Sequence, residues 1–244
     1  FPAHCGTWTF SETTRTWSPV SQPLGLQPSA RILPGMAYDA DEQKIVLFGG
    51  DDLARCLDDT WIYDCKTRTW TQVHPPVKPR ARASHAMVYV PEAKVILMAG
   101  GYAGGWNKLA DVWAYSVARN EWTLLGTGGT ATAGKPTGAT QTVGLGLPEA
   151  TMYASAVYLP REKAVLLAGY PYARNNKTIR TWLLRLDIES APRLQPGNVA
   201  PESAYHCKSI RHATLLPHEW EAGENAPGDS EAGRKELAAL PANV

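Results

Sequence analysis

The stretch IVLFGGDDLARCLDDTWIYDCKTRTW, residues 45–70, recurs in similar form as VILMAGGYAGGWNKLADVWAYSVARNEW, residues 95–122. In both copies a glycine pair ends an apolar run, and two tryptophans nine positions apart follow it. The first tryptophans of the copies, at positions 61 and 113, lie 52 positions apart, as do the second ones at 70 and 122. Self-similarity at a fixed period is typical of a chain built from repeated supersecondary units.

Two further copies flank this pair. The nine-residue tryptophan spacing also occurs at Trp8 and Trp17, 53 positions before Trp61 and Trp70. A weaker copy, AVLLAGYPYARNNKTIRTWLLRLDIESAPRL, has Trp182 in the first tryptophan position, Tyr170 in place of the second glycine and Ala191 in place of the second tryptophan. The chain therefore contains the last two strands of one unit, followed by three units of which the last is degenerate.

Each full unit predicts four short strands, at 32–38, 44–48, 60–64 and 69–73 in one unit, and at 85–90, 95–99, 112–116 and 122–125 in the next. The polar turns DADEQK and PEAK join the first two strands, in keeping with the turn preferences of Asp and Pro. A small four-stranded antiparallel sheet cannot bury both faces alone, so we expect these sheets to stack radially as the blades of a β-propeller. Large aromatic side chains suit the layer of about 10 Å between stacked sheets.

The order of apolar strand, Gly-Gly, variable loop, Asp before Trp, Tyr and second Trp resembles the kelch repeat. LFGG…DDTWIYDCKTRTW and LMAGG…ADVWAYSVARNEW carry the resemblance, which covers roughly residues 6–194, and PPVKPRARASHAMVY resembles the usual lead-in to a blade. The resemblance implies an all-β, kelch-type β-propeller of radial four-stranded antiparallel blades. In this pattern an arginine before the first strand braces neighbouring blades, so we favour a structural role over ligand binding for Arg80 and Arg82.

We expect structural roles for the glycine pairs, the repeated tryptophans and one arginine: Gly49, Gly50, Trp61, Trp70, Arg82, Gly100, Gly101, Trp113, Trp122 and Trp182. Glycine can adopt positive φ and lets neighbouring backbones approach closely. Asp59 and Asp111, just before the first tryptophan of each pair, are expected to accept hydrogen bonds from backbone or arginine groups. His85, in the lead-in strand, is expected to pack beside the channel.

The chain divides into five expected segments. Residues 1–26 are the outer two strands of a split blade, 27–78 a blade, 79–150 a blade with a long Gly/Thr loop, 151–199 a degenerate blade, and 200–244 an irregular segment that links to missing blades. Within the last segment, SIRHATLLP allows one strand. Because propellers use 4–8 blades, we favour an incomplete propeller, a fragment lacking blades on both sides, over a small degenerate ring.

The amino-acid composition limits the classes of binding partner that we expect. The 24 basic and 23 acidic residues are balanced, and no Lys/Arg run occurs, so the sequence gives no electrostatic case for nucleic acid. No apolar run approaches the roughly 20 residues of a membrane-spanning helix, so no membrane insertion is expected. NKT at Asn176–Thr178 is a glycosylation acceptor sequence, which gives a slight lean toward a secreted or extracytoplasmic location.

Loops on a rigid scaffold are the usual place for function. In an antiparallel blade the loops after the second strand share a face with the links between blades. This face would carry the loops DDLARCLD, YAGGWNKLA and PYARNNKTI. The polar and aromatic side chains best placed there to contact a ligand are Arg55, Trp106, Asn107, Lys108, Tyr172, Arg174 and Asn175.

Cysteine and histidine positions match no standard metal signature. His206, Cys207, His212 and His218 form the densest cluster, but their spacing is not that of a zinc site, and no metal or other cofactor is expected. Cys56 and Cys65 flank opposite ends of one strand and are too far apart to pair. Cys5 and Cys56 both precede a third strand in adjacent blades, and whether they pair is left open.

We expect a non-catalytic binding module that presents this loop face to a protein, peptide or glycan. The alternative is part of a carbohydrate-active propeller enzyme, similar to galactose oxidase or to a sialic acid isomerase, with catalytic groups outside this chain. Radical copper chemistry needs a Tyr joined to Cys and further Tyr and His ligands. Tyr102 and Tyr170 follow the glycine positions, but no Cys or His partner matches. A purely structural role in a larger modular surface protein is the third possibility. No catalytic residue is assigned.

Overall fold

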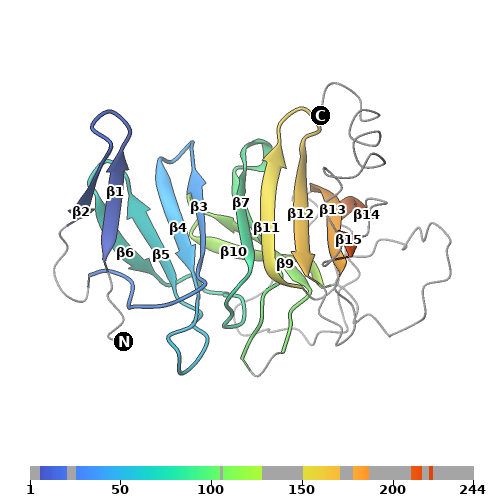
Figure 1. Ribbon diagram of the computed structural model, residues 1–244. Helices are drawn as coiled ribbons and strands as arrows, with labels where there is room; N and C mark the ends of the chain where they lie inside the picture. Colours follow the sequence, from blue (N-terminus) through green and yellow to red (C-terminus); the bar gives the residue numbers. More distant parts are fainter. Residues whose placement is uncertain are drawn as a thin grey trace.

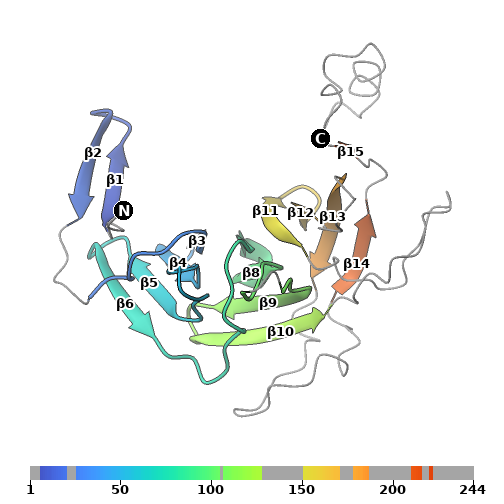
Figure 2. The same cartoon turned by 60° about the horizontal axis from the view of Figure 1, so that its bottom comes forward.

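The computed structural model describes residues 6–20, 26–104, 107–127, 151–170, 178–186, 210–215 and 220–221 of the 244-residue chain. These residues form successive antiparallel β-sheets that follow one another around an open arc, with β1 and β2 at one end and β13 and β14 at the other (Figures 1 and 2). The expectation of an all-β fold made of propeller blades is confirmed. Within the described residues no helix has the length and apolar character needed to cross a lipid bilayer.

Blade 1 consists of the hairpin β1 (Thr7–Ser11) and β2 (Thr16–Val20). Blade 2 is the four-stranded meander β3 (Gly35–Asp39), β4 (Lys44–Phe48), β5 (Thr60–Asp64) and β6 (Thr69–Val73). The last three of these strands have the bounds expected from the sequence. The first begins at Gly35 instead of residue 32, because Leu33 has a φ of 53° and Ile32 forms an isolated bridge with Asp51.

Blade 3 is built in the same way from four strands, β7 (Ala86–Val90), β8 (Val95–Ala99), β9 (Asp111–Ser116) and β10 (Glu121–Thr127). A single 3₁₀ turn, η1 (Pro91–Ala93), joins its first two strands. Strands β6 and β10 lie on the convex side of the arc (Figure 2), and β7 lies next to the first strands of both neighbouring blades. The first strand of each blade is therefore the innermost.

Blade 4 contains β11 (Met152–Leu159), β12 (Ala164–Tyr170) and β13 (Thr178–Leu186). Its next strand is β14 (Ile210–Leu215), and β15 (Trp220–Glu221) pairs with the other end of β13. The strand allowed by SIRHATLLP is thus present and completes this sheet. β14 belongs to the segment expected to begin at residue 200, so the sheet of blade 4 extends across the expected boundary at residue 199.

The repeat seen in the sequence is preserved in the strand register. Trp61 pairs with Leu47, Trp113 with Met98, and Trp182 with Leu167, each time one strand inward. Trp182 therefore holds the first tryptophan position of blade 4. The equivalence of the three blades can be used residue by residue.

The core lies between blades. Trp113 and Trp122 of blade 3 are buried in one cluster with Val46 and Phe48 of blade 2, and the Phe48 and Trp122 rings meet edge to face at 5.0 Å. The opposite face of blade 3 is aliphatic, and it is buried against Trp182 and other side chains of blade 4. Each of these blades therefore turns its tryptophans toward the preceding blade and an aliphatic face toward the next.

A hydrogen bond between blades accompanies this packing. The Trp122 indole N–H donates to the Thr60 hydroxyl at 3.1 Å, and the Trp70 indole N–H donates to the Thr7 hydroxyl at 2.7 Å. In both cases the donor is the second tryptophan of a blade. The acceptor is the residue just before the first tryptophan of the preceding blade.

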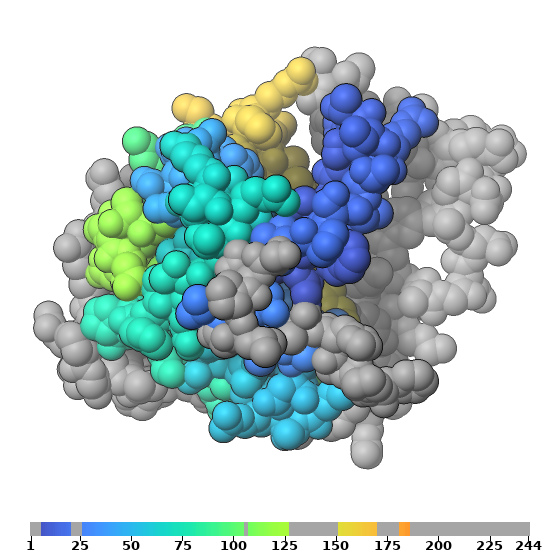
Figure 3. Space-filling view, turned by 90° about the vertical axis from the view of Figure 1, so that its left-hand side faces the viewer, coloured from blue at the N-terminus to red at the C-terminus, as the bar shows by residue number. Residues whose placement is uncertain are grey.

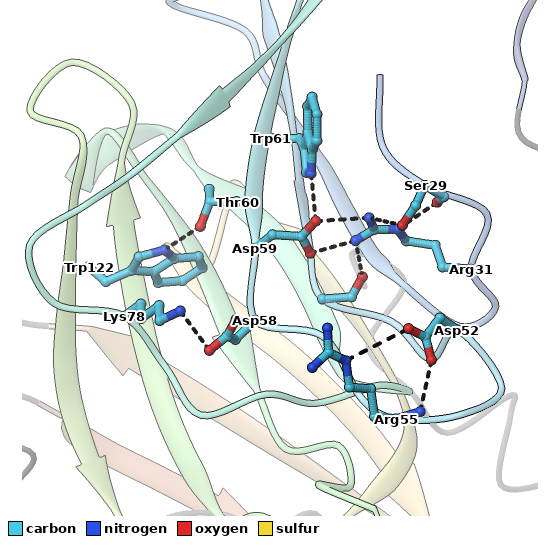
Figure 4. A network of polar contacts seen from close by, with 11 residues as sticks. Ser29, Arg31, Asp52, Arg55, Asp58, Asp59, Thr60, Trp61, Lys78 and Trp122 are labelled. Atoms are coloured by element: carbon cyan, nitrogen blue, oxygen red, sulfur yellow. Dashed lines mark hydrogen bonds and ion pairs between the residues drawn. The ribbon is translucent and has the colours of Figure 1, made fainter. Parts of the chain in front are cut away.

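Blade 2 and blade 3, the two middle blades, each contain an arginine–aspartate ion pair. Arg31 binds Asp59 through two bonds of 2.6 and 2.8 Å, and Arg82 binds Asp111 through two bonds of 2.6 and 2.7 Å. Each carboxylate also accepts the indole N–H of the first tryptophan, Trp61 at 2.6 Å or Trp113 at 2.7 Å. The arginines further donate to the carbonyls of Gly49 and Gly100. Figure 4 shows the blade 2 network.

The glycine pairs let the lead-in segment of the next blade approach. Gly49 and Gly50 have φ values of 59° and 106°, and a Cβ atom on Gly49 would collide with the carbonyl oxygen of Arg82. The Gly50 N–H donates to that same carbonyl at 2.9 Å, and the Arg82 N–H donates to the carbonyl of Leu57. The backbone of Arg82 is therefore bound to blade 2, whereas its side chain is bound to blade 3.

Replacing Arg82 by methionine is expected to destabilise the protein by about 3–5 kcal/mol, because the largely buried Asp111 carboxylate then loses its counter-ion. Denaturant unfolding followed by tryptophan fluorescence measures this loss. Arg119, exposed and paired with Glu121 at 3.2 Å, provides the control, since Arg119→Met is expected to cost less than about 1 kcal/mol. Equal losses in the two variants would contradict a bracing role for Arg82.

The bond between blades can be measured with a double-mutant cycle. Trp122→Phe and Thr60→Val keep most of the apolar volume but remove the indole–hydroxyl bond, so we expect a coupling energy of about 0.5–1.5 kcal/mol in unfolding experiments. Thr13→Val, in the exposed turn of blade 1, serves as the control partner and is expected to be additive with Trp122→Phe. Additivity of the Thr60 pair would show that the bond contributes nothing to stability.

Candidate binding surface

The loops after the second strand of blades 2 and 3 share one face of the arc. In blade 2 this loop is held by two aspartates, since Asp51 accepts the backbone N–H of Leu53 at 2.7 Å and Asp52 accepts those of Ala54 and Arg55 at 2.9 and 2.8 Å. These backbone hydrogen bonds lower the pKa of the partly exposed Asp52 carboxyl. The loop backbone is thus ordered by its own side chains.

The blade 3 loop is anchored on the blade 2 loop. The Tyr102 hydroxyl donates a hydrogen bond to Asp51 at 2.9 Å, and the Cys56 thiol donates one to the backbone carbonyl of Tyr102 at 3.5 Å. Burial first, and then the bond to Asp51, raises the pKa of the Tyr102 hydroxyl to about 12. The contact therefore joins the two loops with a tyrosine that stays protonated at neutral pH.

Arg55, Asn107 and Lys108 lie on these two joined loops. The Arg55 side chain is exposed and 3.9 Å from Asp52, a weak ion pair (Figure 4). Asn107 is exposed, and its carbonyl accepts the N–H of Ala103 at 2.7 Å. Lys108 forms a β-bridge with Tyr102, and partial burial lowers the pKa of its amine. These three expected ligand-binding residues therefore lie on two loops that the Tyr102–Asp51 hydrogen bond joins.

The other expected ligand-binding residues, Trp106, Tyr172, Arg174 and Asn175, lie outside the described part of the chain, as does Asn176 of the NKT sequence. Among the residues assigned structural roles, Trp61, Trp70, Arg82, Trp113, Trp122 and Trp182 are all buried. Arg80 is exposed, and its carbonyl accepts the Nε–H of Arg82 at 3.1 Å.

Asp59 and Asp111 accept arginine hydrogen bonds, as expected. Burial by itself raises the pKa of each carboxyl, but the charge and hydrogen bonds of Arg31 or Arg82 outweigh it. Both pKa values are therefore held below the usual range. Arg31 has the same role as Arg82 but was not among the residues expected to be structural, although it precedes its glycine pair by the same 18 positions.

His85 is buried beside the first strand of blade 2. Its ring meets Phe48 edge to face at 5.7 Å, and a Cβ atom on Gly35 would collide with it. Neither ring nitrogen makes a well-formed hydrogen bond to a described residue, although the Phe48 backbone lies close enough to interact. Burial, helped by the Arg82 charge, lowers the pKa of this imidazole to about 3. It is a packed, neutral histidine.

Cys56 and Cys65 are free thiols, in line with the expectation that they do not pair, and Cys5 lies outside the described residues. No group of three or more His, Cys, Asp or Glu side chains within the described ranges is placed to hold a metal ion. His206, Cys207 and His218 are outside these ranges, and His212 lies in β14.

The family model of the KLHDC2/KLHL20/DRC7 kelch-repeats domain matches residues 3–145. The chain belongs to the kelch-repeat family. The matched residues include the glycine pair, the Asp-x-Trp sequence and the second tryptophan of blades 2 and 3.

Several curated proteins are similar over part of the kelch chain. Multiple epidermal growth factor-like domains protein 8 from Homo sapiens is 34% identical over 109 residues, which cover 44% of this chain and 4% of that protein. Acyl-CoA-binding domain-containing protein 6 from Oryza sativa is 33% identical over 93 residues, 38% of this chain and 14% of that protein. Mei4-dependent protein 6 from Schizosaccharomyces pombe is 26% identical over 97 residues, 37% of this chain. The kelch chain therefore spans a small part of the relatives it matches.

Acidification is expected to destabilise the protein through His85. Below the unfolded pKa of about 6.5 the unfolded chain binds a proton at this residue and the folded chain does not, so stability falls with pH until the folded pKa of about 3. The slope approaches about 1.4 kcal/mol per pH unit. Denaturant unfolding between pH 7 and pH 5 measures it.

The His85→Leu variant is the control for this acid effect and is expected to flatten the stability profile in the same pH range, where the Asp59 and Asp111 carboxylates remain ionised in both states. An unchanged slope in His85→Leu would show that another group causes the acid sensitivity.

Proposed function

We propose that this kelch chain is a non-catalytic module that binds a protein partner through the surface formed by Arg55, Asn107 and Lys108. The observation that supports it is the anchoring of one loop on the other through Tyr102, Asp51 and Cys56. Two exposed polar loops from different blades are held in one arrangement before any partner arrives. Pre-organisation of this kind lowers the entropy cost of association.

The chemistry of the surface suits a protein. It offers a guanidinium, a carboxamide and an amine beside Asp51, Asp52 and Asp58 of the blade 2 loop. Lys78, on the link into blade 3, pairs with Asp58 at 2.7 Å (Figure 4) and extends the charged surface. A mixed-charge, hydrogen-bonding surface selects partners by complementary charge more than by apolar area. Trp106, Tyr172, Arg174 and Asn175 would add to it from the same set of loops.

The test compares two double variants in affinity capture followed by binding measurements with the purified captured protein. Arg55→Ala with Lys108→Ala removes both cations of the loop surface, and we expect the dissociation constant to rise at least about tenfold. Lys66→Ala with Arg119→Ala removes two cations from the turns at the opposite ends of the strands, and binding is expected to be unchanged.

Equal binding by the two double variants would overturn the proposed surface. Glycan arrays probed with the same two variants separate the partner classes, because specific glycan binding lost only in the loop variant would identify a carbohydrate ligand. Thermal unfolding of both variants checks that neither change disturbs the fold.

A further inference from the structure

Blade 4 does not repeat the brace, defined here as the arginine–aspartate ion pair of blades 2 and 3 together with the indole N–H that its carboxylate accepts. Thr151 occupies the arginine position in blade 4. Its carbonyl accepts the N–H of Gly101 at 2.7 Å, just as the carbonyl of Arg82 accepts the N–H of Gly50 at 2.9 Å. A hydroxyl therefore replaces the cation of the brace at this position.

Arg180 occupies the aspartate position. It precedes Trp182 by two residues, as Asp111 precedes Trp113. Its backbone pairs with Gly169, the glycine that follows the same strand position as Gly49 and Gly100 in the other blades. An arginine thus stands where the other blades have a carboxylate, and blade 4 has no acidic residue at either brace position.

Two polar groups of blade 4 at this place have no hydrogen-bond partner among the described residues. Thr151 is 0% exposed, and its hydroxyl makes no hydrogen bond within the described part of the chain. Trp182 is 5% exposed, and no described residue accepts its indole N–H, whereas the equivalent indole of Trp113 donates to Asp111 at 2.7 Å. Buried polar groups are normally paired, and an unpaired one is explained most simply by a ligand that satisfies it.

The site lies inside the chain, where blade 4 packs on blade 3. A Cβ atom on Gly100 would lie 2.7 Å from the Thr151 hydroxyl oxygen, and one on Gly169 would lie 2.9 Å from the Thr151 Cβ. The Thr151 side chain is therefore held between the two blades. Figure 3 views the molecule from the other side, with the β1–β2 hairpin (blue) and blade 2 (cyan) in front of blade 4 (yellow).

The aspartate position is the more accessible member of the brace. The side chains of Asp59 and Asp111 are 20% and 15% exposed, whereas that of Arg82 is 0% exposed. The position that Arg180 occupies in blade 4 can therefore be reached from solvent, and the threonine position is the closed end of the site.

We propose that the junction of blades 3 and 4 binds a small monovalent inorganic anion, with the Arg180 guanidinium, the Trp182 indole N–H and the Thr151 hydroxyl as donors. The same kinds of donor, a guanidinium and an indole N–H, hold the carboxylate in blades 2 and 3, and a cation at such a place needs a counter-ion. Threonine is close to aspartate in size, so blade 4 lacks the charge of the aspartate but little of its volume. The space therefore suits an ion such as chloride. This inference is independent of the proposed loop surface.

Glu149 is the acidic residue of the chain that could supply the charge instead. It lies two positions before Thr151, where Ser29 of blade 2 accepts a hydrogen bond from the brace arginine at 3.0 Å. Glu149 is outside the described residues. A carboxylate from Glu149 and a bound anion are alternative counter-ions for Arg180, so Glu149→Gln is included among the variants.

The test follows thermal unfolding of the whole chain while sodium chloride replaces sodium gluconate at constant ionic strength. We expect the midpoint to rise with the chloride concentration, because an ion that binds only the folded chain stabilises it by mass action. Broadening of the chloride NMR signal reports the same binding directly. Arg180→Gln is expected to weaken chloride binding at least about tenfold, since it removes the charged donor. Arg185→Gln, at another arginine of β13, is the matched control and is expected to leave the chloride dependence unchanged.

A double variant rebuilds the brace in blade 4. Thr151→Arg with Arg180→Asp restores the order of charges found in blades 2 and 3, and we expect it to fold without any dependence on chloride. An unmodified chain that ignores chloride, or a dependence that survives both Arg180→Gln and the double variant, would overturn the proposal. Chloride binding that appears only in Glu149→Gln would also overturn it and would identify Glu149 as the counter-ion. Matching circular dichroism spectra in gluconate establish that the variants are folded.

Discussion

The buried arginine–aspartate pair is the contact on which the arrangement of the blades depends. Arg82 is fully buried, and a charge so placed is tolerated only when it is paired and hydrogen-bonded. Asp111 supplies both oxygens, Trp113 satisfies the same carboxylate, and the Gly100 carbonyl takes a further guanidinium hydrogen bond. Removing any member leaves a desolvated group, so the residues of this cluster are chemically interdependent.

The geometry of the loop surface depends on that arginine–aspartate cluster. The Arg82 backbone is bound to Leu57 and Gly50, which bracket the blade 2 loop, whereas its side chain is bound inside blade 3. The loop that carries Arg55 is therefore fixed to the same segment that positions blade 3. Tyr102 then adds a direct bond from the blade 3 loop to Asp51. A partner that contacts both loops would meet one rigid surface.

The sequence predicts the blades well because their landmarks are local. Strand bounds at 44–48, 60–64, 69–73 and 95–99 follow from apolar runs and turn residues, and the structure reproduces them. The sequence does not reveal that Tyr102 bonds to Asp51, because this contact joins residues 51 positions apart and no repeated motif marks it. The sequence allows a strand at SIRHATLLP but does not show that this strand pairs with β13, because it has no tryptophan landmark and lies far from β13 along the chain. Long-range pairing depends on the fold and not on local pattern.

The blades of this chain stack in one direction only, and two positions in each blade define that direction. A blade turns tryptophans backward and aliphatic side chains forward, so identical blades can add only in one sense. The threonine hydroxyl before the first tryptophan of one blade accepts a hydrogen bond from the indole of the second tryptophan of the next blade. This bond adds a polar requirement to the apolar packing. Val112 and Ala191 lack both groups together, as expected if an unpaired buried donor costs more than the bond contributes.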